Sequence, residues 1–250
     1  MMRGGGGHRG RRPALSPTRG SPVTNVEAAL DMVTDGMTLG LGSGTAAARF
    51  VAALGERVRG GLKVRGVPTS RGTAALAAAA GIPLVELAAA LPLDLAFDGA
   101  DEVDPALNLL KGFGNALVRE KVVAAAARRL VILIGPEKVA EKLVAVLGAR
   151  GKLPVEVVPF AVPLVVRRLA ELGFAADPVR TPAGDPFVSD NGNPILHARV
   201  GPIADPAALD AALRAIPGVV GTGLFLGMAA VVLIENNGRV EVRTPAKSIS

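Results

Sequence analysis

The chain has 250 residues, half of them hydrophobic, which is enough to bury one large core or two smaller ones. With no cysteine and two histidines, it cannot form disulfides, thiolate metal sites or a histidine-rich metal site. The net charge of +6 comes almost entirely from five arginines in residues 1–22, and the rest of the chain is close to neutral at +1. A near-neutral body argues against nucleic-acid binding, and no apolar run approaches the roughly 18 residues of a membrane span.

Residues 1–22 are rich in glycine, arginine and proline and contain no acid, so we expect a disordered basic tail. The tail lacks the apolar central region of a secretory signal. The absence of cysteine suits a reducing compartment, and we expect a cytoplasmic protein. Organellar targeting by the arginine-rich tail remains an alternative.

Order is predicted to begin at Thr24, which forms a capping box with Glu27 and opens a helix that stops before Gly36. A buried strand over 37–41 then leads into the turn 42–45 (GSGT) and a helix over 46–58. A glycine-rich turn between strand and helix is typical of phosphate binding, because backbone N–H groups at the helix start point at the anion. A tight turn without a ligand is the alternative. NAD binding is disfavoured because the third glycine of GxGxxG is missing and no acid follows the next strand.

Short apolar runs alternate with helical segments up to residue 152. We predict strands over 62–67, 82–87, 93–97 and 130–134, and helices over 73–81 and 135–147. This alternation favours a layered, Rossmann-like α/β domain with a parallel sheet.

The pattern changes at residue 153. Strands are predicted over 153–159, 195–200 and 219–226, with helices over 162–172 and 205–216, an irregular segment over 174–188 and a hairpin turn over 190–193. This order matches the split βαβ pattern of a small ferredoxin-like α+β domain. We therefore predict a catalytic domain of residues 23–152 and 227–245, the latter carrying strands over 229–234 and 240–242. The ferredoxin-like domain, 153–226, is inserted in it.

Charged residues follow the predicted strand 93–97, at the sheet edge where open α/β sheets bind ligands. Asp98 and Asp101 lie three apart in a predicted loop, Lys111 precedes a glycine-flanked turn, and Glu120 follows on a helix with apolar neighbours. Apolar surroundings would make the Glu120 carboxylate more basic. The alternatives are a solvated Lys111, an exposed, ion-paired Glu120 and Mg²⁺ bound by the aspartates, although a nearby lysine would compete with the metal. The adjacent Glu102 and Asp104 are expected to be structural or solvated.

Two blocks of this stretch, DGADEV over 98–103 and NLLKGFGNALVREK over 108–121, resemble the signature of the A-type ribose-5-phosphate isomerases. The turn 42–46 and the loop 66–71 (GVPTSR) are similar to further segments of that family. The resemblance implies an aldose–ketose isomerase of the non-oxidative pentose phosphate pathway. It would interconvert D-ribose 5-phosphate and D-ribulose 5-phosphate through an enediolate, as a homodimer without cofactor or metal. Ser43, Thr45, Ala46, Phe113 and Asn115 depart from the family pattern, and Ala46 removes one hydroxyl.

The resemblance also implies the site residues. The catalytic set would be Glu120 as the carbon base, with Lys111, Asp98 and Asp101. The substrate-binding set would be Ser43, Gly44, Thr45, Ala46, Asp98, Gly99, Ala100, Asp101, Lys111, Gly112, Phe113, Gly114 and Lys138.

Two other functions are compatible with this architecture. The first is a non-catalytic sugar-phosphate-sensing module, as in repressors with a similar effector domain, but residues 1–22 cannot supply a DNA-binding domain. The second is an inactive isomerase-like binder, which the joint presence of the four catalytic candidates disfavours.

Overall fold

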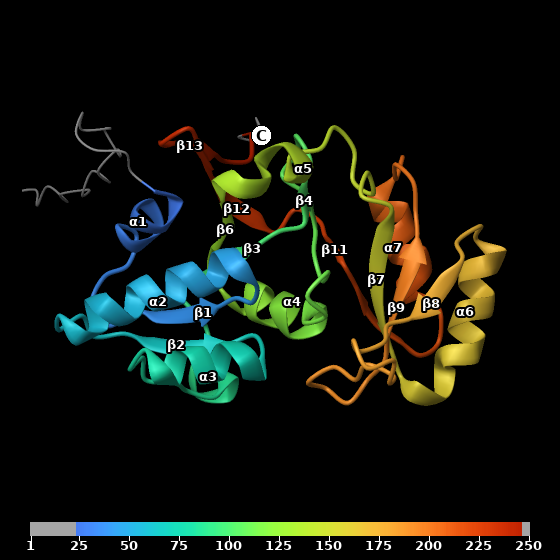
Figure 1. Ribbon diagram of the computed structural model, residues 1–250, viewed down its shortest axis with the longest axis horizontal. Coiled ribbons are helices and arrows are strands. Elements are labelled where there is room, and N and C mark those ends of the chain that lie inside the picture. Colours follow the sequence, from blue (N-terminus) through green and yellow to red (C-terminus); the bar gives the residue numbers. More distant parts are fainter. Residues whose placement is uncertain (1–23, 247–250) are drawn as a thin grey trace, which may run out of the picture.

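The computed structural model describes residues 24–246 except the side chain of residue 138, so the predicted tail 1–22 lies outside the described residues. Its largest unit is a six-stranded sheet with the order β13-β12-β6-β3-β1-β2 (Figure 1). All neighbouring strands are parallel except the β12–β13 hairpin. The strands are β1 Thr38–Leu41, β2 Arg65–Pro68, β3 Leu95–Gly99, β6 Leu130–Ile134, β12 Ala229–Asn236 and β13 Arg239–Arg243. The predicted Rossmann-like parallel sheet is confirmed.

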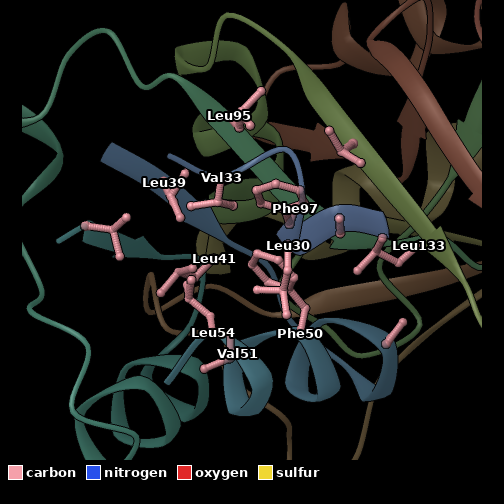
Figure 2. Close-up of a cluster of buried hydrophobic side chains, with 14 of the residues drawn as sticks. Leu30, Val33, Leu39, Leu41, Phe50, Val51, Leu54, Leu95, Phe97 and Leu133 are labelled. Atoms are coloured by element: carbon pink, nitrogen blue, oxygen red, sulfur yellow. The ribbon is translucent and has the colours of Figure 1, made fainter. Parts of the chain in front are cut away.

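Helices cover this sheet because its side chains alternate between two apolar faces. On one face, Phe50 of α2 (Thr45–Arg59) stacks on Phe97 of β3 with ring centroids 4.1 Å apart, within the cluster drawn in Figure 2. On the other face, Val123 of α4 (Leu117–Ala126) packs with Ala96 and Ile132. Two more helices complete this part, α1 (Asn25–Leu30), with the predicted capping box, and α3 (Arg71–Ala79).

A second, four-stranded antiparallel sheet has the order β10-β7-β9-β8. Its strands are β7 Lys152–Val157, β8 Ala176–Pro178, β9 Ile195–Arg199 and β10 Val219–Thr222, and its helices are α6 Val162–Glu171, after the 3-10 turn η3 Pro159–Ala161, and α7 Pro206–Arg214. Numbered within this unit, the strand order is 4-1-3-2, which confirms the ferredoxin-like pattern. The domain boundaries themselves stay a prediction.

A small third sheet, which the sequence did not suggest, joins these two parts in the order β11-β5-β4. Its strands are β4 Glu102–Val103, β5 Leu109–Leu110 and β11 Leu224–Phe225. The single strand predicted over 219–226 is therefore wrong, because the chain leaves β10 at Gly223 and continues in another sheet. Gly223 permits this crossing, since a Cβ there would lie 2.4 Å from the Lys111 carbonyl oxygen.

Two other predicted elements are wrong. In the segment 82–87, only Leu84 forms an isolated bridge, with Gly66, before the 3-10 turn η1 (Leu87–Ala89). The helix predicted over 135–147 is the 3-10 turn η2 (Pro136–Lys138) followed by α5 (Val139–Lys142). It ends early because Leu143 bridges to Val103 and the Val144 N–H donates to the Val103 carbonyl at 3.1 Å. None of the described helices is long and apolar enough to cross a membrane.

Candidate active site

A cavity of about 1250 Å³ opens beyond the carboxyl ends of β1 and β3. Its wall comes from the turn before α2, the start of α3, the segments after β3 and β5, and α4. Most residues of the predicted site line this cavity: Ser43, Gly44, Thr45, Ala46, Gly99, Ala100, Asp101, Lys111, Gly112, Phe113, Gly114 and Glu120.

The predicted phosphate-binding turn forms one end of the cavity. Gly44 precedes α2 with φ of 86°, and no side chain caps the first N–H groups of this 15-residue helix. The Ser43 hydroxyl lies 2.8 Å from the Thr69 and Ser70 hydroxyls. Free N–H groups at a helix start beside a cluster of hydroxyls provide hydrogen-bond donors for an anion.

Asp98 lies inside β3 and not in the loop that the sequence suggested, because Asp98 and Gly99 continue the parallel pairing with β6. Its Oδ1 accepts hydrogen bonds from the Gly99 N–H at 2.8 Å and the Ser43 N–H at 3.2 Å. Gly42 makes this approach possible, since a Cβ on it would lie 2.3 Å from the Asp98 carboxyl carbon. The Asp98 carboxylate is therefore hydrogen-bonded directly to the turn that precedes α2.

Lys111 lies between two carboxylates. Its Nζ is 3.1 Å from Asp98 Oδ2 and 3.3 Å from Glu120 Oε2, and it donates to the Gly99 carbonyl at 2.6 Å. All three side chains are at most 6% exposed. The structure therefore rules out both a solvated Lys111 and an exposed Glu120.

Burial and charge together set the protonation of this group. Burial raises the pKa of Glu120 to about 8, although the Lys111 ammonium pulls it down. Burial likewise raises the pKa of Asp98, against the effect of Lys111. Burial disfavours the Lys111 ammonium, but the attraction of Asp98, Glu120 and Asp101 is stronger and raises the pKa of Lys111. Lys111 is a permanent cation, whereas Glu120 can take up or release a proton near neutral pH.

Asp101 lies at the bend after β3, where its Oδ2 accepts the Phe113 N–H at 2.9 Å. The loop between Lys111 and α4 accommodates Phe113 and Asn115, two residues at which the sequence departs from the family pattern. Asn115 adopts φ of 63°, a conformation that asparagine accepts more readily than most residues. The Phe113 ring lies against two cations, 4.1 Å from Lys152 Nζ and 4.9 Å from Arg150 Cζ.

Some residues lie elsewhere than the sequence suggested, and others were missed. Asp98 lies beneath the cavity lining, and the side chain of Lys138 lies outside the described residues. Glu102 is structural, as predicted, since its carboxylate accepts the Gly148 and Arg150 N–H groups at 2.6 and 2.7 Å. Sequence reasoning missed lining residues of four segments, among them Arg49, Ser70, Gly72, Thr73, Lys142 and Arg150. The junction between β2 and α3 repeats the strand–turn–helix pattern of 42–45, which could have revealed Ser70, Gly72 and Thr73.

We predict that the chemistry of this site does not need a divalent metal. Among the described residues, no three histidine, aspartate or glutamate side chains are grouped so that they could hold an ion. Between Asp98 and Glu120, the Lys111 ammonium occupies the position that a metal would need. Turnover should therefore be unchanged after dialysis against EDTA; loss of activity that Mg²⁺ or Mn²⁺ restores would contradict this scheme.

The chain matches the family model described as ribose 5-phosphate isomerase A (phosphoriboisomerase A) over residues 65–239. It is 50% identical over 224 residues to ribose-5-phosphate isomerase A of Gloeobacter violaceus, covering 89% of this chain and 95% of that protein. It is 51% identical over 223 residues to the Roseiflexus sp. protein of the same name, covering 88% and 94% of the two chains.

Solved structures with the same architecture include ribose 5-phosphate isomerase A of Methanocaldococcus jannaschii. The TM-score is 0.83 at 37% identity, over 89% of this chain and 97% of that one. A D-ribose-5-phosphate isomerase in complex with phospho-erythronic acid also has a TM-score of 0.83, at 35% identity over 88% and 96% of the two chains.

Proposed function

Because the chain belongs to the ribose-5-phosphate isomerase A family and interconverts D-ribose 5-phosphate and D-ribulose 5-phosphate, we propose that Glu120 is the base that moves the proton between C2 and C1. The observation that carries this assignment is the buried contact of Glu120 with Lys111, 3.3 Å away, at the wall of the cavity. No other carboxylate in the cavity wall combines this burial with contact to a cation.

Binding of the phosphate would place the sugar carbons beside Glu120. The dianion would lie at the turn 43–45, where the N–H groups of α2 and the hydroxyls of Ser43 and Thr45 can donate to it. The opened sugar would then extend along the cavity toward Lys111.

In the reaction, the Glu120 carboxylate takes the proton from C2 of the aldose and leaves an enediolate across C1 and C2. Returning that proton to C1 gives the ketose, and the reverse reaction follows the same steps. Negative charge develops on the two substrate oxygens, and the Lys111 ammonium stabilises it. Asp101, which lines the cavity, would exchange protons with the substrate hydroxyls and assist ring opening. Asp98, which lies beneath the lining, would act on the reaction through its contact with the Lys111 ammonium.

The sensing-module alternative has no support in these comparisons, because the relatives at about 50% identity are named as isomerases. One structural relative of this chain, at 35% identity, was solved in complex with phospho-erythronic acid. That ligand is a four-carbon phosphate whose carboxylate resembles an enediolate. It should compete with ribose 5-phosphate for this cavity.

We also propose, on the resemblance to the family, that the chain acts as a homodimer in the cytoplasm. Sedimentation of the purified protein would measure its mass. A monomeric mass at micromolar concentration would contradict the dimer.

The test of the reaction is formation of ribulose 5-phosphate in D₂O. Purified protein should convert ribose 5-phosphate and exchange the substrate's C2 hydrogen with solvent. The assigned base would be contradicted if the exchange of the C2 hydrogen during conversion did not depend on the Glu120 carboxylate.

The pH dependence of kcat/KM should reveal the Glu120 carboxyl group. Its pKa is raised to about 8 by burial, and only the carboxylate can accept the proton from carbon. Activity should therefore rise with pH through the neutral range and level off above about 8. A rate constant already at its plateau at pH 5 would show that the base has an ordinary carboxyl pKa.

A further inference from the structure

The loop 189–193, between β8 and β9 of the small sheet, contacts Arg71 and Arg119, which adjoin residues of the proposed site, although the loop contributes nothing to the cavity wall. Figure 1 shows this irregular segment in orange, extending from the small sheet toward α4. Its function is not explained by the fold of the small sheet alone.

The loop is anchored to a fully buried carboxylate. Glu156 of β7 is 0% exposed, and its Oε1 accepts from the Ser189 hydroxyl at 3.1 Å and from the Asn191 and Asn193 amides, each at 3.0 Å. Hydrogen bonds to a buried charge are stronger than those between neutral groups. Three of them on one oxygen fix the shape of this short loop.

One side of the loop holds the start of α3. Asp190 Oδ2 accepts the backbone N–H of Arg71 at 2.7 Å, and its other oxygen lies 3.8 Å from Arg71 Nε. Arg71 directly follows Ser70, which lines the cavity and whose hydroxyl lies 2.8 Å from that of Ser43. Asp190 therefore acts on the proposed phosphate end of the cavity through one backbone contact.

The other side of the loop holds α4. Arg119 donates from Nε to Asn191 Oδ1 at 2.8 Å and from Nη2 to the Asp190 carbonyl at 3.0 Å. Arg119 directly precedes Glu120 on the same helix. The same five-residue loop thus contacts the helix of the base and the helix that supports the phosphate end.

We propose that Asp190 and Arg119 are positioning residues, which together hold the phosphate end of the site at a fixed distance from Glu120; this inference rests on the proposed function. Asp190 places the start of α3, and Arg119 places the start of α4. Neither side chain lines the cavity, so neither touches the substrate. A small displacement at either end would separate the bound sugar from its base, and such misplacement costs up to about 10²-fold in rate.

The test separates the two ends by steady-state kinetics. Asp190→Ala should raise KM for ribose 5-phosphate about 10-fold and weaken competitive inhibition by inorganic phosphate by a similar factor, with a smaller change in kcat. Asp190→Asn keeps an oxygen that accepts the Arg71 N–H and should restore most of the loss. Arg119→Met should mainly lower kcat, because it releases the helix that carries Glu120.

Asp185→Ala is the matched control, since Asp185 is an exposed aspartate of the same connection between β8 and β9, with no described side-chain hydrogen bond or ion pair. It should leave both constants unchanged. Asp190→Ala and Arg119→Met variants that lower Tm but keep the wild-type KM, kcat and phosphate inhibition would overturn the inference. If Asp190→Ala does not fold, Arg119→Met alone decides by the same criteria, because Asp190→Asn is expected to behave much like the wild-type protein. An inactive wild-type protein would instead refute the proposed function, and this inference with it.

Discussion

Replacing Glu120 by glutamine should lower kcat by roughly 10²–10⁴-fold while KM changes by no more than a few-fold. Glutamine keeps the shape of the side chain and one acceptor oxygen, but it cannot take a proton from carbon. Because the base acts in the transition state, ground-state binding should persist. The fold-change corresponds to about 3–5 kcal/mol of activation free energy. The measurement is steady-state turnover together with exchange of the C2 hydrogen in D₂O.

Glu86→Gln is a suitable control for this substitution, since Glu86 is exposed and caps a short 3-10 turn without a side-chain hydrogen bond. It should behave as the wild-type protein. Near-normal turnover and exchange in the Glu120 variant would show that another group is the base. Asp98 or Asp101 would then be the next candidate.

Replacing Lys111 by methionine should lower kcat/KM by roughly 10²–10³-fold, because the charge that develops on the enediolate oxygens loses its partner. The substitution should also change the pH profile. The ammonium pulls down the pKa of Glu120, so without it burial and the negative charge of Asp98 should raise that pKa above 8. The rising limb of kcat/KM should therefore move to higher pH.

The control here is Lys63→Met, which removes an exposed lysine whose ammonium has no described hydrogen bond or ion pair. Circular dichroism should confirm that both variants are folded. A Lys111→Met variant that keeps the wild-type pH profile would contradict the electrostatic coupling of Lys111 to Glu120. A variant that keeps wild-type kcat/KM would contradict its role as the stabilising cation.

The sequence predicted the inner strands of the central sheet well because these strands are buried on both faces. The runs that became β1, β3 and β6 are almost wholly apolar, and each is followed by glycine or by a polar turn. Two of the wrong predictions have another cause. Leu143 and Leu224 pair with strands far away in the sequence, so local periodicity could not show where α5 ends or that 219–226 divides.

The site was predictable as a set of residues but not as a geometry. The motif resemblance selected Asp98, Lys111 and Glu120, and the structure places them in contact. Their burial could not be read from the motif, because it depends on β3 extending through Asp98 and on Gly42 leaving room for its carboxylate. The bond of Asp190 to the start of α3 is equally invisible in sequence, since it joins distant segments through a backbone group.

The three-stranded sheet also determines when the site can form during synthesis of the chain. The Lys111 N–H donates to the Gly223 carbonyl at 2.8 Å, and β5 is completed by β11. A ribosome that has released only the segments up to α4 has already exposed every proposed catalytic side chain. Lys111 nevertheless lacks its backbone anchor until residues 223–225 have left the exit tunnel. The catalytic centre is therefore assembled late in translation, and a chain truncated before β11 should carry the complete motif without a working site.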